Sequence, residues 1–252
     1  GDAFRLLEVA GLARLLARGE RFEVPWTSLD KLVVALYGYT VLVYLVRSDE
    51  EAYAYQIGTA VDAFLCYFLV RVLATSIEDY KWLLRYLSLL LIPFVPLVVY
   101  ESMTFQNPFA AIGGVELIRA GDVWIREGRL RATGSFGHPS LLGTFGGVFL
   151  PLYVSVFLSG ERRLLVVAGI ISCLAIVWAS NSGAPSICVV AAMFGFALWP
   201  FRNNMGFVRI AIIVAVLALA AIMNAPIWYV LARISEITGG DGYHRAALMD
   251  IA

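Results

Sequence analysis

The stretch GRLRATGSFGHPSLLG, residues 128–143, places a dense group of polar side chains at the start of a long apolar run. Proline fits the first turn of a helix, so the stretch predicts a helix that begins at Pro139 with Ser135 or His138 near its cap. Free backbone N–H groups at that end, together with nearby guanidinium groups, would form an anion site suited to phosphate or diphosphate. The candidate residues are Arg129, Arg131, Gly134, Ser135, His138 and Pro139.

Other interpretations of these residues stay open at this point. Arginines near an apolar run commonly extend to lipid headgroups, and Arg129 and Arg131 could do only that. A single histidine beside a proline, such as His138, is more often a structural residue than a catalyst. The glycines of LLGTFGGVFLP, residues 141–151, favour close helix packing, with a lipid chain along the smooth face as the alternative.

The elements that must position these residues are membrane helices. Of the 252 residues, 60% are hydrophobic and only 15% are charged, well outside the average for soluble proteins. A helix needs about 20 mostly apolar residues to cross a bilayer. Seven crossings are predicted, at about 32–46, 57–74, 82–100, 138–159, 164–179, 184–201 and 208–224.

The expected architecture is an all-α polytopic membrane protein with an additional amphipathic helix at the N-terminus. Residues 4–18 place arginines on one half of a helical wheel and leucines on the other, which predicts a helix lying at the membrane interface. We divide the chain into a cytoplasmic helix and link (1–31), a transmembrane domain (32–224, with an outer loop at 101–137), and the start of a large extracytoplasmic loop (225–252).

The distribution of lysine and arginine predicts the orientation. Short loops on the side of the N-terminus hold most of the basic residues, which is typical of the cytoplasmic side. The long loop 101–137 and the segment after about 224 are therefore expected outside. Arg131 would then face outward.

Several classes of site are poorly supported by the sequence. The formal net charge is zero, so no basic field favours nucleic acid. Walker, H-E-x-x-H and G-x-S-x-G motifs are absent. With two histidines and three cysteines within apolar runs, neither a metal site nor a disulfide framework is indicated, and we expect no cofactor.

The pattern R-x-x-G-S-F-G-H-P-S-x-L-G, residues 131–143, resembles the signature R-x-x-G-[ST]-F-x-[NH]-P-N-x-x-[AG] of the O-antigen ligase and polymerase family. Two further stretches are similar to family motifs. ESMT with NPF, residues 101–109, is similar to E-x-x-T-G-x-N, and GYHRAALMDIA, residues 242–252, is similar to G-R-x-x-L-W-x-x-A. The sequence departs from the pattern at Ser140, where asparagine is usual, and at SNSGA, which lacks a frequent arginine.

The resemblance implies a GT-C-like, metal-independent, inverting glycosyltransferase of the bacterial inner membrane. Such an enzyme transfers a glycan from undecaprenyl diphosphate to lipid A core or to another glycan on the periplasmic face. Arg131, Arg129 and Arg245 would bind the donor diphosphate, supported by the helix start at Gly134, Ser135, His138 and Pro139. The family's catalytic histidine is expected beyond Ala252, so we expect this chain to be a fragment.

The sequence leaves three functions open. A ligase and a polymerase of this family differ only in the acceptor. A transporter, the alternative from another class, would favour paired ionisable residues at the middle of the membrane, where we find only Asp62. The third possibility is a non-catalytic assembly subunit. Membrane lipids are expected partners in every case.

Overall fold

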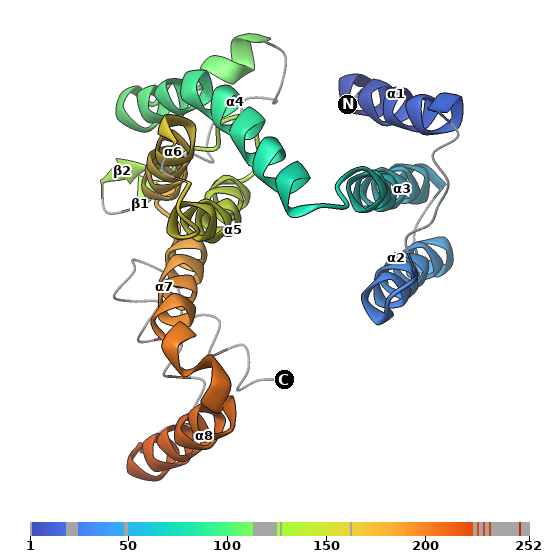
Figure 1. Ribbon diagram of the computed structural model, residues 1–252. Helices are drawn as coiled ribbons and strands as arrows, with labels where there is room; N and C mark the ends of the chain where they lie inside the picture. The colour runs from blue at the N-terminus through green and yellow to red at the C-terminus, as the bar shows by residue number, and fades with distance from the viewer. Residues whose placement is uncertain are drawn as a thin grey trace. The chain divides into compact units, whose positions relative to one another are not determined.

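The computed structural model describes residues 2–18, 25–47, 50–112, 125–126, 128–161 and 163–223, with residues 226, 229, 232 and 247 (Figure 1). Within these residues the regular secondary structure is helical apart from one two-stranded hairpin. The contacts divide the chain into two units, residues 1–80 and residues 81–252. We describe each unit by itself.

The first unit contains α1 (Asp2–Arg18), α2 (Ser28–Arg47) and α3 (Glu50–Leu73). Asp62 lies within the apolar α3, and a carboxylate in such a helix requires a partner. Arg5 of α1 supplies one, with Nε at 3.2 Å from each carboxylate oxygen. The predicted N-terminal helix is thus confirmed as a helix. Its packing against α3 was not predicted, and this packing explains the intramembrane acid.

The second unit contains α4 (Ile77–Thr104) from Lys81 onward, α5 (Pro139–Leu158), α6 (Leu164–Ser180), α7 (Gly183–Ala197) and a further apolar helix, α8 (Met205–Ile222). A 3-10 turn, η1 (Pro108–Ile112), follows α4. The hairpin pairs β1 (Ile125–Arg126) with β2 (Arg129–Leu130), with Arg126 opposite Arg129. The 3-10 turn η2 (Trp199–Asn204) leads from α7 into α8.

A helix occupies each of the seven predicted crossings, but they differ in length. Five are long and apolar enough to cross a membrane: Ser28–Val46, Tyr55–Leu73, Ile77–Thr104, Pro139–Leu158 and Trp199–Ile222. The remaining two, α6 and α7, have 17 and 15 residues. At about 1.5 Å per residue they are shorter than a 30 Å hydrocarbon core. The all-α architecture is confirmed for the described residues, and five of the helices have the length and apolar composition of a membrane span.

The core of the second unit lies between α4, α5 and α6. The ring of Tyr153 is fully buried, and its hydroxyl donates to the carbonyl of Leu84 at 2.7 Å and accepts from Ser88 at 3.0 Å. Gly169 makes room for this ring, because a Cβ there would lie 2.3 Å from it. Gly146 of α5 likewise faces Cys173 and Ile176 of α6, so close packing is the role that the contacts of this glycine support.

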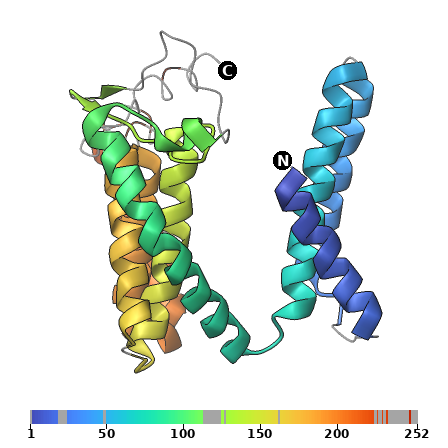
Figure 2. The ribbon, with the colours of Figure 1, turned by 90° about the horizontal axis from the view of Figure 1, so that it is seen from above.

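The helices of this unit bring distant loops together at two opposite ends (Figure 2). At one end Lys81 and Arg85 of α4 form ion pairs with Glu161, in the turn between α5 and α6. Hydrogen bonds from Arg85 and Lys81 lower the pKa of the Glu161 carboxyl group. At the other end the last turn of α4 contacts Thr133 in the loop before α5, and Arg131 at the start of this loop contacts both the first turn of α5 and the turn between α6 and α7. The predicted anion site lies at this second end.

Candidate functional site

A buried carboxylate fixes the segment that carries Arg131. Glu101, in the last turn of α4, accepts hydrogen bonds from the backbone N–H of Thr133 at 2.9 Å and from that of Gly134 at 2.8 Å. Asn107 donates to Glu101 at 3.2 Å and to the carbonyl of Gly134 at 2.9 Å. Gly134 has a positive φ of 58°, which favours glycine at this turn. The loop before α5 is therefore attached to α4 by polar contacts.

The hairpin that precedes this loop covers the C-terminal end of α6. The backbone N–H of Ala132 donates to the carbonyl of Ala179 at 3.0 Å. Arg129 lies over the ring of Trp178 at 4.2 Å and contacts the carbonyl of the same residue at 3.5 Å. The last carbonyls of a helix have no partner within the helix and carry partial negative charge. Arg129 is thus placed to stabilise the end of α6.

Arg131 lies in a different environment, between the starts of two helices. Its guanidinium group donates to the hydroxyl of Ser140 at 3.3 Å and to that of Ser182 at 3.2 Å. Ser140 belongs to the first turn of α5, and Ser182 is the N-cap of α7. The two hydroxyls lie 3.0 Å apart. One guanidinium, two hydroxyls and two helix N-termini are thus gathered at one point, and each of these groups favours an anion.

The start of α5 agrees with the sequence prediction. Pro139 is the first helical residue, and the Nδ1 atom of the N-cap His138 accepts from the backbone N–H of Ser140 at 3.1 Å. Ser135 is exposed in the preceding turn, so of the two candidates His138 provides the cap. Because its ring binds the backbone, His138 is placed as a structural residue.

The electrostatics of the site favour a negatively charged guest. Burial, and then the charge of Arg126, lower the pKa of Arg131 from its ordinary value. A guanidinium nonetheless stays protonated in proteins. Burial and the charge of Arg131 lower the pKa of His138 as well, so its imidazole is neutral at pH 7. A bound anion would relieve the repulsion between the arginines.

Acidification is expected to weaken the start of α5 through His138. Because the pKa in the folded protein lies below the ordinary value of about 6.5, the neutral cap contributes fully above that pH, and its contribution is lost as the pH falls through the lowered pKa. His138→Asn keeps an acceptor for the helix N-terminus and does not titrate. The midpoint of thermal unfolding should fall more for the wild type than for His138→Asn between pH 7 and pH 5. Equal falls would contradict this role.

One residue predicted for the site lies outside the described part of the chain. Arg245 belongs to the segment 233–246, so the structure does not place it relative to Arg131. The sequence placed Glu101 and Asn107 in a stretch similar to a family motif, but sequence reasoning assigned no role to either residue or to Ser182. The available signal for Glu101 was its position in the last turn of an apolar helix, because an acidic group there needs polar partners.

Comparison with protein-family models, curated proteins and solved structures found no match for this chain. The site is therefore interpreted from its own residues and geometry.

Proposed function

We propose that this protein is a membrane glycosyltransferase resembling the O-antigen ligases. It transfers a glycan from undecaprenyl diphosphate to an acceptor sugar, such as lipid A core. The observation that carries the proposal is the placement of Arg131 between the N-terminal ends of α5 and α7, within reach of Ser140 and Ser182. This group matches what a diphosphate requires.

In the proposed reaction the acceptor hydroxyl attacks the anomeric carbon of the donor sugar. The bond from that carbon to the diphosphate oxygen breaks, and the leaving diphosphate takes the negative charge. Arg131 stabilises this developing charge, which is how a fixed cation accelerates such a step. The family resemblance implies that a histidine accepts the proton of the hydroxyl. The reaction requires no metal ion, because the arginine supplies the positive charge.

The proposed orientation places the Arg131 site at the periplasmic face of the inner membrane, with the N-terminus in the cytoplasm and seven helices crossing. The basic loops predicted on the cytoplasmic side include Lys81, Arg85 and Glu161, which are joined at one end of the second unit. The loops predicted outside include Glu101, Arg131 and Ser182, which are joined at the other end. This grouping supports the predicted alternation of sides.

The function is tested with the full-length protein reconstituted in proteoliposomes. A polyprenyl diphosphate-linked oligosaccharide is supplied with either lipid A core or free repeat-unit glycan as acceptor, with EDTA present. We expect a product with the added mass of the glycan, and the acceptor that yields it separates ligase from polymerase. Movement of a solute across the bilayer without any glycan product would instead favour the transporter.

A further inference from the structure

We propose that the groove between α2 and α3 binds one anionic phospholipid, with the lipid phosphate on Arg71 and one acyl chain along the helices. This α2–α3 groove comprises the pocket at Trp26, Asp30, Phe68 and Arg71 and the hollow at Gly38, Val41 and Ala60 that continues it. It belongs entirely to the first unit of the chain. The proposal is independent of the glycosyltransferase activity.

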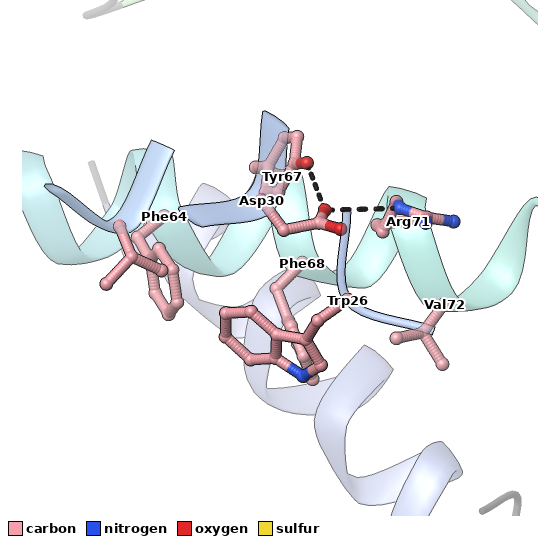
Figure 3. Close-up of a pocket in the computed structure, with 8 residues that line it drawn as sticks. Trp26, Asp30, Phe64, Tyr67, Phe68, Arg71 and Val72 are labelled. Carbon is pink, nitrogen blue, oxygen red and sulfur yellow. Dashed lines mark hydrogen bonds and ion pairs between the residues drawn. The ribbon is translucent and has the colours of Figure 1, made fainter. Parts of the chain in front are cut away.

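The groove has one polar end. Figure 3 shows Asp30 of α2 in contact with Tyr67 and Arg71 of α3, with Trp26 and Phe68 below this cluster. Tyr67 donates to Asp30 at 2.5 Å, and the Nε of Arg71 lies 3.3 Å from the same carboxylate oxygen. Tryptophan and arginine are typical of the level of the lipid headgroups, where an apolar ring and a polar end are both accommodated.

The rest of the groove is apolar and continuous with this end. Val34 and Phe64 line both the pocket and the adjoining hollow. The hollow then follows α2 to Val41 and α3 back to Ala60, as expected for antiparallel neighbours. A Cβ added at Gly38 would meet no atom within 4 Å, so this part of the groove is open beside α2.

The length of the groove fits a single acyl chain. From Asp30 to Val41 the helix rises by roughly 16 Å, at about 1.5 Å per residue. One leaflet of a 30 Å hydrocarbon core is about 15 Å deep. A phospholipid chain would therefore reach from the headgroup level to the middle of the bilayer within the groove, whereas a polyprenyl chain would extend far beyond it.

The charges at the polar end select an anionic headgroup. Thr27 donates to Asp30 through its backbone N–H and its hydroxyl, both at 2.6 Å, so the carboxylate is occupied by protein donors. Its side chain is 10% exposed, against 31% for that of Arg71. Arg71 has five N–H groups, and the described contacts use one on Asp30 and one on Pro25. With the neighbouring Lys31, the cluster carries one net positive charge.

The proposal is tested by native mass spectrometry of the full chain titrated with phosphatidylglycerol or phosphatidylcholine. We expect one phosphatidylglycerol to bind about fivefold more tightly than phosphatidylcholine, the effect of one basic residue on an anionic lipid. Arg71→Gln should remove this preference. Gly38→Leu should weaken the binding of both lipids at least tenfold because the added side chain fills the groove. Gly38→Ala should weaken their binding less.

Two variants serve as matched controls. Gly195→Leu also adds a side chain where a Cβ meets no atom within 4 Å, and Arg202→Gln also removes an arginine beside a tryptophan, but both lie in the second unit. Both should bind the lipids as the wild type does, and circular dichroism verifies the helical content of every variant. Unchanged lipid binding in folded Gly38→Leu and Arg71→Gln would overturn the proposal. Displacement by glycerol phosphate alone would overturn it too, since the ligand would then be a free anion.

Discussion

Replacing Arg131 with alanine is expected to lower the rate of glycan transfer by about 100- to 1,000-fold, the loss seen when a fixed group that stabilises developing charge is removed. The physical reason is the position of the guanidinium group between the starts of α5 and α7. The hydroxyls of Ser140 and Ser182 lie 3.0 Å apart and remain able to bind each other in the variant. The measurement is the initial rate of product formation in proteoliposomes at saturating donor.

Conservative and matched variants separate this role from a structural one. Arg131→Lys keeps the charge but loses the fork that binds two phosphate oxygens, so it should recover only part of the rate. Arg129→Lys changes the group that covers Trp178 at the end of α6, and it should affect thermal stability more than transfer. A wild-type transfer rate in a folded Arg131→Ala protein would refute the assignment of the donor site.

The helices were predictable because each depends on local information. A run of apolar residues and the break after it are visible in the sequence, and all seven predicted ranges contain a helix. The start of α5 was predictable for the same reason, since Pro139 marks a first turn by itself. The hairpin at Ile125–Leu130 was not predicted, because its two short strands have no periodicity that a sequence pattern would reveal.

The site was predictable only in part, because its members are distant in the chain. The spacing around Arg131 indicated an anion site at a helix start, but it gave no sign that a second helix start, at Ser182, lies beside it. The spacing alone also gave Arg129 and Arg131 the same role, and only the family resemblance, which begins at Arg131, distinguished them. The structure separates their roles, since Arg129 faces the carbonyl end of α6 and Arg131 faces two hydroxyls. Such a difference arises from tertiary packing and not from local sequence.

Glu101→Ala is expected to lower the free energy of unfolding by about 2 to 6 kcal/mol, because two buried backbone N–H groups would lose their acceptor at about 1 to 3 kcal/mol each. These are the N–H groups of Thr133 and Gly134, and Glu101 itself is only 3% exposed. The loop that carries Arg131 would lose its attachment to α4. Thermal unfolding of the purified protein measures the stability, and the transfer assay should show a parallel loss of activity.

The expected order of variants tests whether Glu101 acts through these hydrogen bonds. Glu101→Gln has the same shape but only one acceptor oxygen, so one of the two N–H groups would face an amide donor, and its loss of stability should lie between those of alanine and the wild type. Thr104→Ala removes an exposed hydroxyl that binds only its own helix, and it should change stability by less than about 0.5 kcal/mol. If Glu101→Ala were as stable as Thr104→Ala, the carboxylate would not hold the loop, and the position of Arg131 would depend on its contacts with the starts of α5 and α7.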